Sequence, residues 1–293
     1  MRVTLARLSL SGLLVAAHLV WAAAAATAPK VRVFVLAGQS NMDGRGYTVE
    51  LSGPLAVWAT PQHDVRLAYS NSTKRGAYTS GGFVPLQPGY SVKPGVFEKQ
   101  GKDFTFPGAT FGPEVSFGRT LAEAFPKERI ALIKFSEGGT SLSVDWAPDN
   151  ADGVYPQCLA FVRQALKTLG AEGDLVELSG FVWHQGESDF KLPPGQYRAL
   201  LRDFIARLRK DLNSPDLPFI VGEVFDNGQR NAVRADQLAV SKSVPATLFV
   251  TSAGLNTRDQ GTHFDTPSQI ELGQRMAQTW LKEFSRQRLP AER

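Results

Sequence analysis

Short apolar segments alternate with longer amphipathic ones along most of this chain, and no other feature constrains the fold as strongly. Five apolar segments are predicted to be buried strands: 31–37, 129–135, 178–183, 217–224 and 247–251. Five amphipathic segments are predicted to be helices: 112–125, 156–169, 195–212, 232–240 and 267–284. Strands that alternate with helices form a parallel sheet with helices on both faces. The pattern therefore predicts one α/β domain, a three-layer α/β/α sandwich around a mainly parallel sheet of about five strands.

The region between the first strand and the first helix does not follow this alternation. Residues 43–110 are rich in Gly, Pro, Ser and Tyr and show no sustained period. A structureless connection of this length is unusual inside a compact domain. We therefore predict an elaborated loop region, with room for minor strands, inside a single domain of residues 29–293.

The first 28 residues have the composition of a secretory signal peptide. Arg2 and Arg7 precede an apolar run over residues 8–21, and an alanine-rich stretch then ends at Ala28. An uncleaved membrane anchor is the alternative, but the apolar run is short for a span and contains polar residues. We expect cleavage near Ala28, export to the periplasm or the extracellular space, and no stable insertion into a membrane.

Charge and cysteine content exclude several classes of protein. The formal net charge is +4, and removal of Arg2 and Arg7 with the signal peptide lowers it to about +2. Because Lys and Arg are scattered rather than clustered, we predict no nucleic-acid partner. Cys158 is the single cysteine, so no intramolecular disulfide can form, and we interpret it as a small buried apolar residue. No zinc-type Cys/His spacing occurs, and we predict no metal site.

Polar clusters follow the predicted strands at their carboxyl ends. They cover residues 38–42, 137–141 and 184–189, and a fourth cluster at 259–265 precedes the last helix. In open α/β sheets, ligands bind beyond the carboxyl ends of the strands. Four clusters at one edge of the sheet therefore predict a binding or catalytic site there.

Ser40 is the candidate nucleophile of this site. It follows the first strand on a turn that Gly38 makes possible, where nearby backbone N–H groups can face a developing oxyanion. The alternative interpretation is a helix N-cap. A nucleophilic serine needs a base, and His263, just before the last helix, is flanked by Asp259 and Asp265, either of which could orient its imidazole.

Several longer motifs make a resemblance to a known family specific. They are GQSNM at 38–42, FGPE at 111–114, EGGTSL at 137–142, WHQGESD at 183–189 and THFD at 262–265 followed by ELGQRMA. In this order, the chain resembles the SGNH-hydrolase superfamily, and within it the sialate O-acetylesterase-like (SASA) group, which is related to carbohydrate esterase family 6 acetylxylan esterases. The resemblance covers nearly the whole chain after the signal peptide and implies an SGNH-type, flavodoxin-like fold.

The resemblance also implies a role for individual residues. Ser40 matches the nucleophile and His263 the base, while the Ser40 N–H, a backbone N–H near Gly139 and the Gln185 side chain match the oxyanion hole. Asn41 and Glu187 are expected to support the site. His184 should point away from Gln185, into the core or toward a supporting hydrogen bond.

The acidic member of the triad departs from the family pattern. The family has D-x-x-H, but the residue three positions before His263 is Gln260, and Asp259 lies four positions before it. Gly261 could give the longer turn the freedom to aim Asp259 at the imidazole. The alternatives are a Ser–His dyad, or Glu187 or Asp265 as the partner. We favour Asp259.

Together, the residues and the resemblance predict a secreted serine carbohydrate O-acetylesterase of the acetylxylan or sialic-acid type, which acts through an acetyl-serine intermediate without metal or cofactor. Two alternatives remain: a catalytically impaired glycan-binding protein of this fold, or a general lipase or esterase of the same superfamily. Aromatic residues in the 43–110 region suit stacking on sugar rings, or simple packing: Tyr47, Trp58, Tyr69, Tyr78, Phe83, Tyr90 and Phe97.

Overall fold

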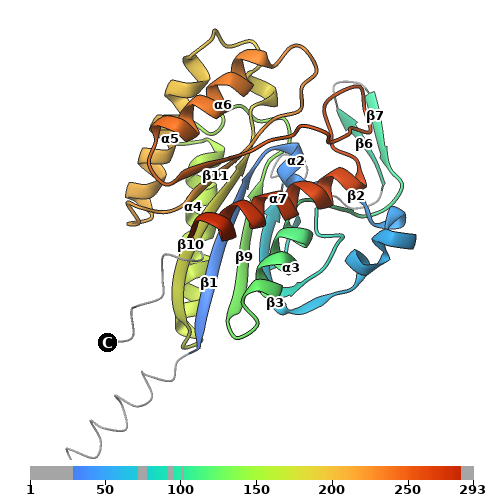
Figure 1. The fold of residues 1–293 in the computed structure, drawn as a ribbon, viewed down its shortest axis with the longest axis vertical. Coiled ribbons are helices and arrows are strands. Elements are labelled where there is room, and N and C mark those ends of the chain that lie inside the picture. The colour runs from blue at the N-terminus through green and yellow to red at the C-terminus, as the bar shows by residue number, and fades with distance from the viewer. Residues whose placement is uncertain (1–28, 72–77, 92–94, 100–101, 285–293) are drawn as a thin grey trace, which may run out of the picture.

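The computed structural model describes residues 29–71, 78–91, 95–99 and 102–284 (Figure 1). The predicted signal peptide, residues 1–28, lies outside the described residues. Within the described ranges, no helix is long and apolar enough to span a bilayer.

A mainly parallel sheet forms the centre of the molecule. Its parallel strands, in spatial order, are β12 (Thr247–Val250), β11 (Phe219–Gly222), β10 (Leu175–His184), β1 (Lys30–Gly38), β9 (Arg129–Ser136) and β3 (Gln62–Asn71). The short strands β4 (Tyr78–Thr79) and β5 (Val84–Leu86) pair antiparallel with β3, which brings the sheet to eight strands over the described residues. The predicted fold class is confirmed, with all five predicted strands present, but the sheet is larger than predicted.

The additional parallel strand, β3, lies inside the segment that we predicted to be an elaborated loop. Near its start are two polar, exposed residues, His63 and Asp64, which mask the apolar pattern of the residues that follow. Val65 and Leu67 are fully buried in the sheet core and pair with β9. Tertiary pairing with a neighbouring strand, and not local periodicity, therefore defines this element.

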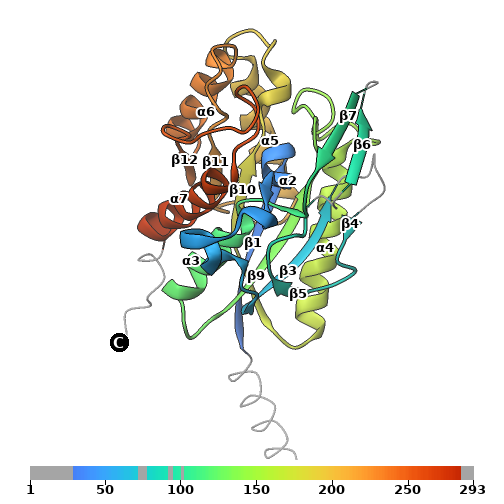
Figure 2. The ribbon, with the colours of Figure 1, turned by 90° about the vertical axis from the view of Figure 1, so that its right-hand side faces the viewer.

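Helices cover both faces of the sheet, as predicted (Figure 2). One face packs against α3 (Glu114–Ala124) and α7 (Thr266–Phe284), and the other against α4 (Val154–Ala171), α5 (Gln196–Asp211) and α6 (Asn231–Ser243). From Val33 to Ala37 strand β1 is entirely apolar, because these residues contact both layers. Val33 and Val35 belong to the core under α4 and α5, whereas Phe34 and Leu36 belong to the core under α3 and α7.

The order of the strands determines where a ligand can bind. From β1 the chain runs to β3 and β9 on one side, whereas from β10 it runs to β11 and β12 on the other. Neighbouring strands β1 and β10 therefore form the topological switch point, and in open α/β sheets ligands bind beyond the carboxyl ends of such strands. Gly38 at the end of β1 lies opposite His184 at the end of β10.

Two glycines allow backbones to approach at positions that no other residue could occupy. Gly38 has φ +150°, and a Cβ there would lie 2.0 Å from the His184 carbonyl oxygen. Gly273 of α7 packs so closely on α3 that a Cβ would lie 2.2 Å from the Pro113 carbonyl oxygen. The motifs at 111–114 and 271–277 therefore meet as a helix–helix contact.

The 43–110 region carries further small elements. These are β2 (Gly46–Tyr47), the 3₁₀ helices Thr48–Glu50 and Gly53–Ala59, the hairpin of β6 (Gly95–Lys99) and β7 (Lys102–Phe106), and β8 (Thr110–Phe111), which pairs with β2. Tyr69 stacks on Tyr90 at a centroid distance of 4.8 Å and meets Tyr78 edge-on at 5.4 Å. These three rings pack against one another and the core.

Candidate active site

Ser40 is the first residue of α2 (Ser40–Asp43), a single helical turn that follows β1. Its backbone N–H has no partner within this helix because the first turn leaves its amides unpaired. The Ser40 side chain does not cap the helix: its Oγ lies 3.0 Å from Nε2 of His263. The structure thus brings the predicted nucleophile and base into hydrogen-bond distance across 223 residues of sequence.

Asp259 reaches the other nitrogen of the same imidazole. Its Oδ2 lies 2.5 Å from Nδ1 of His263, and its Oδ1 accepts the backbone N–H groups of His263 at 2.6 Å and Thr262 at 3.2 Å. Because a carboxylate only accepts hydrogen bonds, Nδ1 carries the proton and the lone pair of Nε2 faces Ser40. Burial raises the pKa of Asp259, but the hydrogen bonds and charge of His263 outweigh it, so the pKa lies below its usual value.

The turn between Asp259 and His263 accommodates the four-residue spacing through Gly261. This glycine has φ +93°, a conformation that other residues rarely adopt. The alternative acids lie elsewhere in the network. Asp265 accepts the N–H of Ser268 at the start of α7, and Glu187 accepts a hydrogen bond from Asn41.

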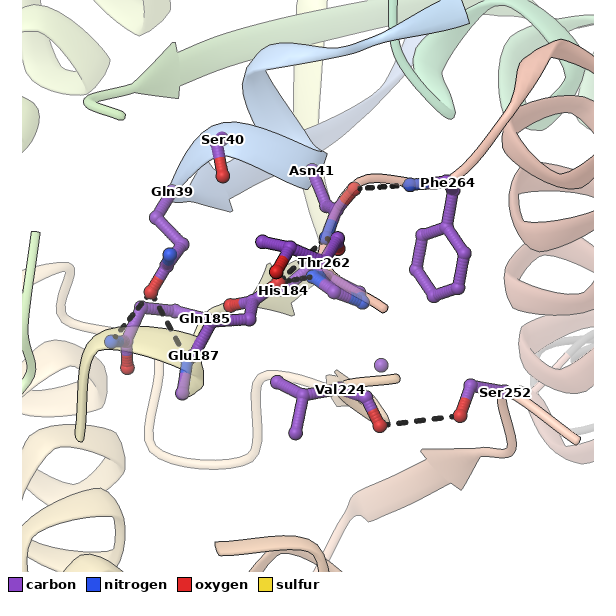
Figure 3. A network of polar contacts seen from close by, with 12 residues as sticks. Gln39, Ser40, Asn41, His184, Gln185, Glu187, Val224, Ser252, Thr262 and Phe264 are labelled. Carbon is purple, nitrogen blue, oxygen red and sulfur yellow. Dashed lines mark hydrogen bonds and ion pairs between the residues drawn. The ribbon is translucent and has the colours of Figure 1, made fainter. Parts of the chain in front are cut away.

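Asn41 links the nucleophile helix to the histidine loop (Figure 3). Its Nδ2 donates to the Thr262 carbonyl at 2.9 Å and to Glu187 Oε1 at 2.7 Å, and its Oδ1 accepts the N–H of Phe264 at 3.0 Å. The two backbone contacts lie on either side of His263. A fully buried side chain next to Ser40 therefore fixes the position of the base relative to the nucleophile.

Glu187, which accepts from Asn41, lies next to His184. His184 is fully buried, and its Nε2 lies 3.2 Å from the Glu223 carbonyl, which requires the proton on Nε2. Burial lowers the pKa of His184, against the attraction of the nearby Glu187 carboxylate. A neutral, buried imidazole that packs edge-on against Phe264 at 5.6 Å supports the site from below, in the supporting position that we predicted.

Gln185 departs from its predicted role as an oxyanion donor. The side chain is fully buried, and its Nε2 has three acceptors: Gln39 Oε1 and the Thr140 carbonyl, both at 3.0 Å, and Asp189 Oδ2 at 2.7 Å. An amide nitrogen has only two hydrogens, so none is left for a substrate in this arrangement. Gln185 instead joins the loops that follow three strands, and Figure 3 shows Gln39 reaching toward it.

The loop after β9 brings Gly138 and Gly139 to the nucleophile. A Cβ on Gly138 would lie 3.9 Å from Cβ of Ser40, so this loop passes beside the serine. Gly139 has φ +75°. Asp189 holds the loop from behind, where its carboxylate accepts the N–H groups of Leu142 at 2.7 Å and Ser143 at 3.1 Å. The loop that contains Gly139, the predicted oxyanion donor, is therefore held in place beside Ser40.

A buried polar network lies under α2. Lys134 of β9 pairs with Glu114 at 2.8 Å, with both side chains fully buried, and donates to the Asp43 carbonyl at the end of α2 at 2.8 Å. The Asp43 carboxylate in turn accepts from Ser136 at 3.2 Å and pairs with Arg45 at 2.8 Å. These charges anchor the short helix that carries Ser40.

Some residues of the site were not predicted from the sequence. Gln39 and Asp189 lay inside recognised motifs, which could have suggested roles for them. Lys134 lies in an otherwise apolar strand, and Arg230, which donates to the Gly261 carbonyl at 2.7 Å, belongs to no motif. Among the described residues, no group of three or more His, Cys, Asp or Glu side chains could hold a metal ion.

Comparisons with known proteins identify the family. The family model described as "Carbohydrate esterase, sialic acid-specific acetylesterase" (SASA) matches residues 30–282. A probable carbohydrate esterase of Arabidopsis thaliana is 24% identical over 261 residues, which cover 87% of this chain and 92% of that protein.

Solved structures show the same fold. An Arabidopsis thaliana protein structure matches with a TM-score of 0.67 at 23% identity and covers 87% of this chain and 100% of that one. The structure of NanS matches with a TM-score of 0.64 at 16% identity, over 89% and 99% of the two chains. A carbohydrate acetylesterase from Xanthomonas citri matches with a TM-score of 0.56 at 20% identity, over 85% of this chain but 55% of that one. Since the family match spans most of the sequence, this chain belongs to the SASA family of carbohydrate esterases and is a carboxylic ester hydrolase.

Proposed function

We propose that the chain is a serine O-acetylesterase that removes acetyl groups from the hydroxyls of sugars through an acetyl-Ser40 intermediate. The observation that carries the proposal is the continuous chain from Ser40 Oγ through both nitrogens of His263 to Asp259, with contacts of 3.0 and 2.5 Å. Such a chain activates a hydroxyl for attack on an ester carbonyl.

In the first half of the reaction, Nε2 of His263 takes the proton of Ser40 while Oγ bonds to the acetyl carbonyl carbon. Asp259 stabilises the imidazolium that results and keeps the proton on Nδ1. The carbonyl oxygen becomes an oxyanion, and the backbone N–H groups of Ser40 and Gly139 are its proposed donors. Loss of one such donor typically lowers kcat by about 10²- to 10³-fold. The tetrahedral intermediate then collapses as His263 donates its proton to the departing sugar hydroxyl.

In the second half, water repeats these steps on the acetyl-enzyme. His263 removes a proton from the water, the hydroxide adds to the acetyl carbonyl, and Ser40 leaves with the proton returned by Nε2. Acetate and the free enzyme are the products. Gln185, Asn41 and Glu187 would act here as supports of the reacting groups.

Ser40→Ala tests the proposal. This variant should release no acetate above background from acetylated sugars, and its circular dichroism spectrum should match that of the wild type. Acetate release at the wild-type rate would refute the assignment.

A panel of acetylated xylan, O-acetylated sialic acids and simple acetate esters then identifies the preferred substrate. Preference for long-chain lipid esters would favour the general lipase alternative.

A glycan-binding protein without catalysis was the other alternative, and its main support was the displaced acid. The Asp259–His263 contact supports catalysis instead, because the longer turn still brings the carboxylate to the imidazole.

We also propose export after cleavage near Ala28, since the basic start, apolar run and alanine-rich end of residues 1–28 have the composition of a signal peptide. N-terminal sequencing of the protein recovered outside the cytoplasm should begin near Pro29. A protein that retains Met1 there would contradict this.

A further inference from the structure

Arg230 contacts the turn between Asp259 and His263. It immediately precedes α6, and 6% of it is exposed. Its Nη1 donates to the Gly261 carbonyl at 2.7 Å, and its Nη2 donates to Thr262 Oγ1 at 3.2 Å. Both acceptors lie between the acid and the base of the catalytic chain, so the guanidinium spans the part of the turn that sets their separation.

Asn41 contacts the same turn through a separate pair of backbone groups. It contacts the Thr262 carbonyl and the Phe264 N–H, the residues on either side of His263 in the sequence, and Figure 3 shows these contacts. Glu187 joins the two supports because it accepts from Asn41 at 2.7 Å and attracts the charge of Arg230. Burial lowers the pKa of Arg230 below its usual value, and the charges of the Glu187 and Asp259 carboxylates offset part of this effect.

The turn has internal hydrogen bonds from the Thr262 and His263 N–H groups to Asp259, and Arg230 adds contacts at Gly261 and Thr262. Gly261 has φ +93°, and glycine adopts many other conformations in an unrestrained chain. The side chains of Asp259 and His263 are 45% and 27% exposed, so packing restrains them weakly. A shift of about 1 Å in a catalytic group can cost about 100-fold in rate.

We propose that Arg230 is a positioning residue for catalysis: its guanidinium holds residues 259–263 in the conformation in which Asp259 reaches Nδ1 and Nε2 faces Ser40. The inference rests on the proposed acyl transfer at Ser40. It explains how a turn one residue longer than the family pattern keeps the acid in contact with the base.

The test compares Arg230→Met with a matched control, Arg234→Met. Arg234 lies one helical turn further on and pairs with Glu223 at 2.8 Å and with Asp226. Two rates are measured: kcat for acetate release, and covalent labelling of Ser40 by a fluorophosphonate, which requires an activated serine but no sugar. Arg230→Met should lower both rates by about 10- to 100-fold with KM within about threefold of wild type. Arg234→Met should stay within about threefold in both rates.

A double-variant cycle distinguishes positioning from a general structural effect. If Arg230 acts through the Asp259–His263 contact, Arg230→Met should add less than about threefold to the loss caused by Asp259→Asn. Losses that multiply, or an Arg230→Met variant with wild-type rates, overturn the proposal.

If Arg230→Met does not fold, Thr262→Val decides, because it removes one acceptor of the guanidinium and leaves the charge in place. It should lower the rate of Ser40 labelling about fivefold, the effect expected from the loss of one hydrogen bond. An unchanged labelling rate overturns the proposal. A wild type that labels at Ser40 but releases no acetate from sugars would instead refute the proposed substrate.

Discussion

Replacement of Asp259 by Asn separates a Ser–His–Asp triad from a Ser–His dyad. The Asn Oδ1 can still accept the N–H groups of His263 and Thr262, so the turn should survive. Its Nδ2, however, would face Nδ1 of His263 at the position where a carboxylate oxygen now lies at 2.5 Å. Two donors cannot face each other, so the imidazole proton moves to Nε2, which can then no longer accept the Ser40 proton.

The size of the loss follows from the exposure of the carboxylate. In buried Ser–His–Asp triads, the same change lowers kcat about 10⁴-fold through the wrong tautomer. Here the Asp259 side chain is 45% exposed, so water can solvate the imidazole and restore part of the active tautomer. We therefore expect kcat to fall about 10²- to 10³-fold, which is about 2.7 to 4.1 kcal/mol, with little change in KM.

The assay is steady-state release of acetate from a fixed acetylated substrate at several concentrations, so that kcat and KM are separated. Asp265→Asn is the control, because Asp265 binds the N–H of Ser268 and does not contact the imidazole. It should keep the wild-type kcat. A near-wild-type kcat for Asp259→Asn would refute the triad and favour the dyad.

Three further predictions concern stability. Gly38→Ala should destabilise the protein by more than about 3 kcal/mol, because its Cβ would lie 2.0 Å from the His184 carbonyl oxygen. Gly170→Ala, on an open position of helix α4, should be neutral or stabilise by up to about 1 kcal/mol in the same urea titration; equal effects of the two changes would contradict the close approach. Lys134→Met should cost about 3 to 5 kcal/mol because it leaves Glu114 buried and unpaired, and Lys134→Met/Glu114→Gln should recover part of this loss; a double variant less stable than the single one would argue against the ion pair. Because the pKa of Asp259 is lower in the folded state, its carboxylate stabilises the folded state at pH values above 3.8, the usual pKa. This contribution is lost as the pH falls through the pKa of the folded state. Asp259→Asn should therefore reduce the difference between the Tm values at pH 6 and pH 3. The reduction should be modest because the Asp259 side chain is half-exposed. An unchanged difference would show that the carboxylate does not stabilise the folded state.

Elements with a strong local period were predictable from the sequence. Strand β1 and helix α5 appear close to their expected bounds because their apolar residues alone specify which faces are buried. Strand β3 was not predictable in the same way. Its polar start and its position in a glycine- and proline-rich region gave no period, and its strand character comes from pairing with β9.

Within the site, sequence motifs identified residues better than they identified contacts. The spacing of Asp259 and His263 left the triad open, because a glycine-containing turn can aim the carboxylate in several directions. The side chain of Gln185 was expected to face a substrate, but Thr140, from the loop after β9, and Asp189, four residues further along the same loop, bind its amide. Arg230 contacts residues 31 and 32 positions further along the chain, a relationship that no local pattern encodes.

Trapping of the acyl-enzyme tests the central claim most directly. The purified protein is mixed with an activated acetate ester, quenched in acid within milliseconds and measured by intact mass spectrometry, followed by peptide mapping. The proposed mechanism predicts a transient gain of about 42 Da, the mass of one acetyl group, on the peptide that contains Ser40, and no gain in Ser40→Ala. Turnover without any adduct on Ser40, or an adduct that persists in Ser40→Ala, would contradict it.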